Sequence, residues 1–182
     1  LIREKYQGKI RCLVRKTSDT KCLEESGLDI EYAVGDLGDI RFLTESIESV
    51  DTVLHIASIT YSENIVQAAI ANGVDWIICV HTTGRFSKYK SASADYIRIE
   101  DGILKLRDKI NITIVRPTMI YGSSCDANMW KLINFLYRYR IFPVFGGGKN
   151  LMQPVHARDL GNAYFDILNH SNVTKNKEYD LR

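Results

Sequence analysis

The chain has 182 residues, which is enough for one domain with a substantial core, and 45% of them are hydrophobic. Its 24 Lys and Arg and its 22 Asp and Glu leave a formal net charge of +2, and the basic residues are scattered among acidic ones. This balance argues against a nucleic-acid partner, which would need a concentrated basic surface.

Apolar runs of strand length alternate with stretches of helical period along the first half of the chain. We expect strands over 9–14, 30–34 and 52–57. The stretch 40–49, between the last two of these, has helical spacing and predicts a helix. Ser62 is placed to cap the next helix, and Asn72-Gly73 is a typical helix end.

The second half of the chain repeats the same alternation. Strands are expected over 76–80, over 110–115 and around Tyr179, and helices over 94–107 and 128–139. The run at 76–80 is nearly all apolar, as expected for a parallel strand with helices on both faces. Alternating strands and helices imply right-handed crossovers, so we predict an α/β fold with a doubly wound parallel sheet of the Rossmann type.

Small and polar residues follow the predicted strands, at the edge where such a sheet binds ligands. The Asp36 carboxylate can accept a hydrogen bond from an adenine amine, and Ala57 and Ser58 allow close approach of the backbone to a ring or ribose. Thr82 and Thr83 supply hydroxyls after the next strand. Each residue taken singly is also typical of a turn or cap. Together, in strand order, they predict a nucleotide-binding crevice.

Five short phrases along the chain carry a family resemblance. They are Asp36-Leu37, His55-Ile56-Ala57-Ser58, Thr82-Thr83-Gly84, Arg116-Pro117-Thr118-Met119-Ile120-Tyr121-Gly122 and Val155-His156-Ala157-Arg158-Asp159-Leu160. These phrases resemble the extended or atypical short-chain dehydrogenase/reductases, the NAD-dependent epimerase/dehydratase group. The resemblance covers nearly the whole chain and implies an NAD(P) cofactor.

The resemblance also implies which residues bind the cofactor and the substrate. Asp36 and Leu37 would flank the adenine, with Ala57 and Ser58 beside the ribose and phosphates. Pro117 and Thr118 would flank the nicotinamide. Residues 1–125 would form the NAD(P)-binding core. Residues 126–182 would form a short substrate-side region that meets a small molecule such as a nucleotide sugar.

Enzymes of this family usually act through a Ser or Thr hydroxyl, a Tyr, and a Lys four residues after the Tyr. Tyr96 lies thirteen residues after Thr83, which suits this pairing, but Glu100 stands where the Lys is expected. A nearby cation favours the ionised phenol during proton exchange with the substrate, and a carboxylate there opposes this role. Two functions therefore stay open: an NAD(P)-dependent epimerase, dehydratase or reductase, and a non-catalytic protein that senses NADP.

Two basic residues after the first predicted strand bear on the choice of cofactor. NAD-dependent enzymes often place an acidic residue there for the ribose 2′-hydroxyl, whereas this chain has Arg15-Lys16. Two cations favour the 2′-phosphate, so we expect NADP. The oligomeric state stays open, although the helix over 94–106 matches the region through which relatives often form a homodimer.

Histidine and cysteine spacing gives no sign of a metal site. The four histidines, His55, His81, His156 and His170, show no paired ligand spacing, and His55 and His81 are interpreted as core residues. The four cysteines lie far apart, which favours a reduced, cytoplasmic protein. No signal peptide or long apolar span supports a membrane location.

The strand and glycine-rich turn that open a Rossmann sheet have no counterpart in the sequence. In the usual strand order 3-2-1-4-5-6, the absent strand would lie between the strands at 9–14 and 52–57. Two open edges would then carry backbone groups without partners. We expect either that the protein has upstream residues beyond this sequence or that another segment fills the position. Direct pairing of the two strands would refute this expectation.

Overall fold

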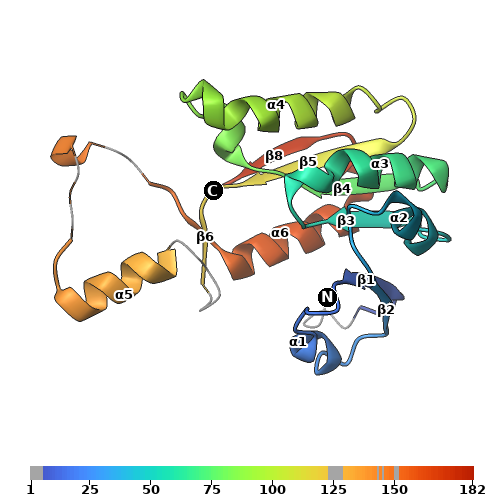
Figure 1. Ribbon diagram of the computed structural model, residues 1–182, viewed down its shortest axis with the longest axis horizontal. Coiled ribbons are helices and arrows are strands. Elements are labelled where there is room, and N and C mark those ends of the chain that lie inside the picture. Colours follow the sequence, from blue (N-terminus) through green and yellow to red (C-terminus); the bar gives the residue numbers. More distant parts are fainter. Residues whose placement is uncertain (1–5, 123–128, 143, 145, 150–151) are drawn as a thin grey trace.

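The computed structural model describes residues 6–122, 129–142, 144, 146–149 and 152–182 (Figure 1). The strands are β1 (Ile10–Val14), β2 (Ile30–Val34), β3 (Thr52–His55), β4 (Trp76–Val80), β5 (Asn111–Pro117), β6 (Ile120–Tyr121), β7 (Val155–His156) and β8 (Glu178–Leu181). The α-helices are α1 (Lys21–Glu24), α2 (Ile40–Ser46), α3 (Ser62–Ala71), α4 (Lys90–Leu104), α5 (Met129–Tyr139), α6 (Ala157–Asn169) and α7 (Ser171–Thr174). Three short 3-10 turns are η1 (Ile59–Tyr61), η2 (Thr83–Phe86) and η3 (Gly146–Gly148).

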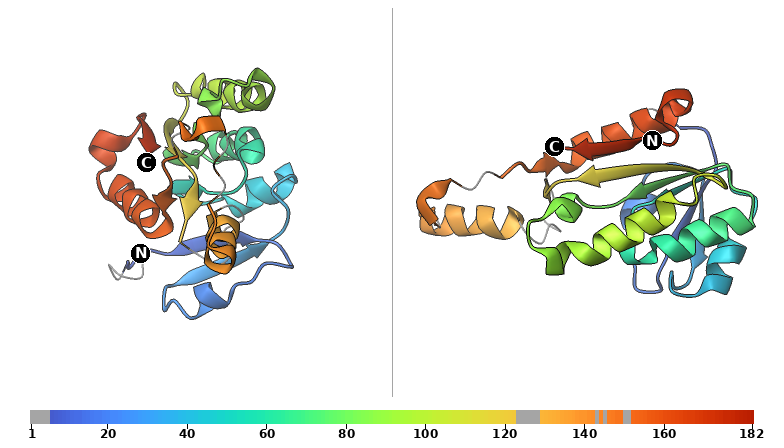
Figure 2. Two further views of the ribbon diagram at one scale, coloured as in Figure 1. Left: turned by 90° about the vertical axis from the view of Figure 1, so that its left-hand side faces the viewer. Right: turned by 90° about the horizontal axis from the view of Figure 1, so that it is seen from above.

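Four parallel strands in the order β3-β4-β5-β8 form the main sheet. Side chains of β4 alternate between its two faces: Ile77 packs in a cluster with α2, α3 and α4, and Ile78 packs in a second cluster with α6. Figure 2 shows α6 on one side of the sheet and α3 and α4 on the other. Both isoleucines are fully buried. The predicted α/β fold with a doubly wound parallel sheet is therefore confirmed.

The first two strands form a separate parallel pair, β1-β2, below the main sheet in Figure 1. Within the described residues β1 pairs only with β2, and β3 pairs only with β4. The Arg11 guanidinium of β1 donates to the backbone carbonyls of Ser46 and Glu48, at 3.0 and 2.8 Å, just before β3. The direct pairing that would refute a missing strand does not occur. What completes the sheet stays a prediction.

Strand bounds follow the sequence pattern closely, and helix bounds follow it less well. The strands at 30–34 and 76–80 have the predicted bounds, but the helix expected over 40–49 ends at Ser46. The helix expected from 94 begins at Lys90. The expected cap by Ser62 is wrong, because Ser62 is the first residue of α3 and its hydroxyl is buried between His55 and His81. Tertiary hydrogen bonds outweigh its local capping preference.

The last part of the chain returns to the main sheet. Strand β8 pairs with β5, and Ile167 of α6 packs against Trp76 and Val115. Helix α5 extends away from the sheet in Figure 1, and among its described residues none is buried. The division of the chain at 125/126 stays a prediction. Within the described residues, no helix is both long and apolar enough to cross a membrane.

Candidate functional site

The carboxyl ends of β4 and β5 bring the predicted catalytic residues into one region. Strand β4 leads through His81 and Thr82 into η2, which carries Thr83. The Thr83 hydroxyl donates a long hydrogen bond of 3.4 Å to the Pro117 carbonyl at the end of β5. The segment predicted to supply a catalytic hydroxyl is therefore next to the segment predicted to flank the nicotinamide.

Gly84 explains how Tyr96 approaches this turn. A Cβ atom on Gly84 would lie 3.2 Å from Cε2 of the Tyr96 ring and 3.2 Å from the Thr82 hydroxyl. Because glycine has no side chain, the tyrosine ring of α4 can pack directly on η2. Thr83 and Tyr96 thus lie on two elements in contact.

Thr118 offers a hydroxyl that no described protein group uses. Its backbone N–H donates to the Leu181 carbonyl at 3.0 Å, which ties the residue to the end of β8. Its Oγ1 is buried and has no hydrogen-bond partner among the described residues. A buried hydroxyl without a partner is costly, so this atom is suited to meet a polar group of a ligand.

The other residues predicted to bind the cofactor lie after β2 and β3. Asp36 is exposed, and its Oδ1 accepts from the Gly38 N–H at 2.7 Å. Leu37 is partly buried and packs against the main core. This packing fixes the position of Leu37, whether or not adenine contacts it. Ala57 and Ser58 are exposed in the segment that follows β3, after Ile56. The open positions of Asp36, Ala57 and Ser58 suit a ligand lying over the strand ends.

Arg15 and Lys16 are exposed in the turn after β1. The Arg15 N–H donates to the Ser18 hydroxyl at 3.0 Å, and the Ser18 N–H donates to the Arg15 carbonyl at 2.9 Å. These bonds fix the backbone of the turn. Both side chains therefore stand in solvent on the β1-β2 pair, apart from the Thr83 turn on the main sheet.

Glu100, the residue in place of the expected lysine, is fully buried. Its carboxylate accepts hydrogen bonds from His81 at 2.8 Å and from the Arg116 Nη2 at 2.6 Å, and it pairs with Arg85. Arg85 and Arg116 compensate its charge inside the protein. From the sequence, we expected this carboxylate to oppose ionisation of the Tyr96 phenol. In the structure, the carboxylate instead pairs with His81, Arg85 and Arg116.

A chain of buried hydrogen bonds continues from Glu100 to the end of β3. The His81 Nε2 lies 3.1 Å from the Ser62 hydroxyl, which lies 3.1 Å from the His55 Nε2. Burial lowers the pKa of both histidines to about 4, with His81 adding to the effect at His55, and Arg116 and Arg85 adding to it at His81. Both imidazoles are therefore neutral at pH 7. Their interpretation as core residues is confirmed.

Sequence reasoning missed Arg85, Arg116 and Ser62 as members of this cluster. A signal was available for Arg116, because it is a cation at the end of a strand whose other residues are mostly apolar. Such a buried guanidinium needs a carboxylate. The sequence gives no comparable signal for Ser62.

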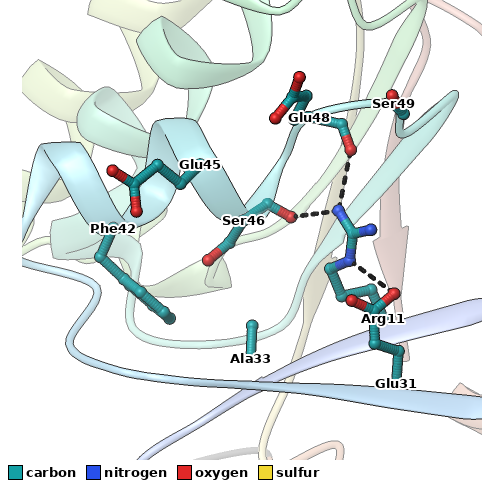
Figure 3. Close-up of a pocket in the computed structure, with 8 residues that line it drawn as sticks. All are labelled: Arg11, Glu31, Ala33, Phe42, Glu45, Ser46, Glu48 and Ser49. Carbon is teal, nitrogen blue, oxygen red and sulfur yellow. Dashed lines mark hydrogen bonds and ion pairs between the residues drawn. The ribbon is translucent and has the colours of Figure 1, made fainter.

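A hollow of about 350 Å³ lies apart from the predicted site, between the β1-β2 pair and α2 (Figure 3). Arg11, Glu31, Glu45 and Glu48 supply charged groups to its wall. None of the predicted site residues lines the hollow. Within the described part of the chain, no three His, Cys, Asp or Glu side chains are grouped as a metal ion would require.

No family model matches the sequence. The chain is 24% identical over 166 residues to the uncharacterised protein y4nG of Sinorhizobium fredii (strain NBRC 101917 / NGR234). That match covers 74% of this chain and 42% of that protein. The chain therefore spans less than half the length of this curated relative.

Solved structures resemble this chain across almost its full length. The gox2253 structure has a TM-score of 0.78 at 20% identity, covering 99% of this chain and 64% of that one. A double mutant of DesIV, the dTDP-glucose 4,6-dehydratase of Streptomyces venezuelae with NAD and DAU bound, has a TM-score of 0.76 at 15% identity, with coverage of 99% and 68%. QOR2, an NADPH-dependent quinone oxidoreductase of Escherichia coli, has a TM-score of 0.72 at 20% identity, with coverage of 99% and 61%.

At these identities the likeness concerns the fold. The chain has the fold of NAD-dependent epimerase/dehydratase and short-chain dehydrogenase/reductase proteins. The resemblance predicted from the sequence is thus confirmed at the level of the fold.

Proposed function

We propose that this chain is the nucleotide-binding part of an NAD(P)-dependent oxidoreductase of the epimerase, dehydratase or reductase type. One observation carries the proposal. The Thr83 turn contacts both Pro117 and Tyr96, at the carboxyl edge of a parallel sheet where this fold binds nucleotides. The neighbours of the same fold include proteins described with NAD and with NADPH.

The residues present fit such a cofactor. Pro117 and the unpartnered Thr118 hydroxyl would meet the nicotinamide, and the exposed Ala57 and Ser58 would meet the ribose and phosphates. Asp36 and Leu37 would flank the adenine. When bound, the nicotinamide supplies the hydride chemistry. We infer NADP as the cofactor, because Arg15 and Lys16 are exposed cations suited to a 2′-phosphate.

In the proposed reaction Tyr96 exchanges a proton with a hydroxyl or carbonyl of the substrate. Thr83 orients the same substrate oxygen by exchanging its long hydrogen bond to the Pro117 carbonyl, 3.4 Å, for one to the substrate. The packing of the Tyr96 ring on Gly84 limits the positions open to the phenol, so the two groups are presented together. The substrate we propose is a small molecule, for example a nucleotide sugar of the kind named for DesIV.

We also propose that a further parallel strand joins β1 to β3 in the functional protein. Both strands are edges among the described residues, and Arg11 of β1 already binds the end of α2 and the loop that leads to β3. In the Rossmann order, a glycine-rich turn at this position would hold the cofactor pyrophosphate at a helix N-terminus.

A homodimer through α4 and a cytoplasmic location stay predictions from the sequence.

Binding and turnover by the whole protein test the proposal. Calorimetry with NADP and NAD should give tighter binding of NADP, and Tyr96→Phe should lower kcat at least about 100-fold with little change in cofactor affinity. Tyr89→Phe is the matched control, because Tyr89 is 79% exposed and should be replaceable without loss. Cofactor binding with a kcat indifferent to Tyr96→Phe would exclude catalysis by Tyr96 and favour a non-catalytic NADP sensor.

A further inference from the structure

We propose that Glu100 is a positioning residue that holds the Thr83 turn, the Tyr96 helix and the Pro117-Thr118 strand end in one arrangement. The proposal rests on the proposed function, because these three segments matter to a reaction only if they form its site. Glu100 touches none of the proposed reacting groups in the described contacts. It acts through Arg85, Arg116 and His81.

Arg85 connects Glu100 to the turn that carries Thr83. Arg85 lies two residues after Thr83 in η2, and its guanidinium reaches across to α4. One nitrogen pairs with Glu100, and the other donates to the Asp101 carboxylate at 3.1 Å. This fork fixes η2 against the helix that presents Tyr96, because a planar guanidinium bound at two points has little freedom to rotate.

Arg116 connects Glu100 to the strand end that would meet the nicotinamide. Its Nε lies 3.0 and 3.1 Å from the two Glu100 oxygens, and its Nη2 lies 2.6 Å from Oε1. On the far side Arg116 also pairs with Glu178 and Asp180 of β8. Since Arg116 directly precedes Pro117, this network fixes the end of β5 relative to α4.

His81 connects Glu100 to β4, the strand that leads into the Thr83 turn. The neutral imidazole donates from Nδ1 to Glu100 and accepts from the Ser62 hydroxyl at Nε2, which satisfies both ring nitrogens. Because His81 immediately precedes Thr82, the end of β4 is held from the same carboxylate. One side chain of α4 therefore meets groups from β4, η2 and β5.

The place of Glu100 in the helix distinguishes this role from that of an ordinary core ion pair. Glu100 follows Tyr96 by four residues, so the two side chains lie one turn apart along α4. A change in the partners of Glu100 should therefore shift η2 under the Tyr96 ring, where even a Cβ atom on Gly84 would lie only 3.2 Å from the ring.

Arg85→Gln is the primary test, since it releases η2 while leaving the buried pair of Glu100 and Arg116 in place. We expect NADPH to bind the full protein about tenfold more weakly, and the unfolding midpoint to fall as well, because the buried Glu100 loses one of its two compensating cations. Amide exchange over 83–87 should be about tenfold faster. Arg85→Lys should recover part of the affinity, because it keeps the charge without the fork. Arg98→Gln is the matched control, since Arg98 is an exposed cation of α4, the helix that carries Glu100.

Glu100→Gln should reproduce these effects if the variant folds, and Arg85→Gln decides the matter if it does not. A lowered unfolding midpoint with unchanged NADPH affinity and unchanged exchange over 83–87 would reduce the network to a structural role and overturn the proposal. If the unaltered protein binds no NADPH, the proposed function fails. Amide exchange over 83–87 in Arg85→Gln then still decides whether Arg85 and Glu100 hold η2 against α4.

Discussion

The main sheet and the β1-β2 pair are both parallel and both rich in apolar residues, yet they are stabilised differently. Strand β4 is paired on both sides and its Ile77 and Ile78 are fully buried. Every residue of β1 is only half-buried, and Arg11 and Leu13 provide its contacts toward the main body. Parallel strands are stable when they have neighbours on both edges and helices on both faces. Among the described strands, the inner strands β4 and β5 of the main sheet meet both conditions, and β1 and β2 do not.

The largest expected effect on stability comes from matched truncations of one buried side chain in each region to alanine. Ile112→Ala in β5 should lower the free energy of unfolding by about 3 to 4 kcal/mol, because Ile112 is fully buried and its cavity cannot collapse. Leu13→Ala in β1 should cost about 1 to 2 kcal/mol, since Leu13 is half-buried. Urea denaturation measures both values. Equal losses would show that β1 is as well packed as the main sheet.

Acid should weaken the main sheet selectively. His55 and His81 have folded pKa values of about 4 against an ordinary 6.5, so between these values the unfolded chain binds more protons. Stability is therefore lost as the pH falls from 6.5 to 4, by roughly 3 kcal/mol per histidine at most. Residues 6–50 contain no histidine, so the β1-β2 pair gains no such dependence.

Denaturation midpoints between pH 7 and pH 4.5 measure this loss. His55→Gln should reduce the slope, whereas His170→Gln, a change at an exposed site, should leave it unaltered. A midpoint that stays constant over this range would contradict the buried, neutral state of the two imidazoles.

The smallest effect concerns the edge of β1 and leaves global stability unchanged. The Ile10 N–H donates to Asp29 beside β2, and successive N–H groups alternate sides, so those of Arg11 and Leu13 point away from β2. In this chain we expect these two amides to exchange about 100-fold faster than that of Cys12. Protection of all three in the same measurement would mean that a strand already occupies the edge.

Much of the fold could be predicted because local patterns decide it. The apolar runs at 30–34 and 76–80 are strands wherever both faces can be covered, and their bounds agree with the structure. Helix ends were harder to predict, because Ser62 has the chemistry of a cap and is used instead between two buried imidazoles. The choice between these uses depends on His55 and His81, 7 and 19 positions away, and the local pattern does not show that the fold brings both imidazoles to this hydroxyl.

The sequence by itself determined the alternation of strands and helices, the polar residues after each strand and the substitution of Glu100 for a lysine. Only the tertiary structure decided what Glu100 does. Its partners Arg85, Arg116 and His81 come from three segments that become neighbours when β4 and β5 pair and α4 packs on them. These neighbours stabilise the charged form of the buried carboxylate, because a group without solvent contact depends on nearby cations and hydrogen-bond donors for compensation.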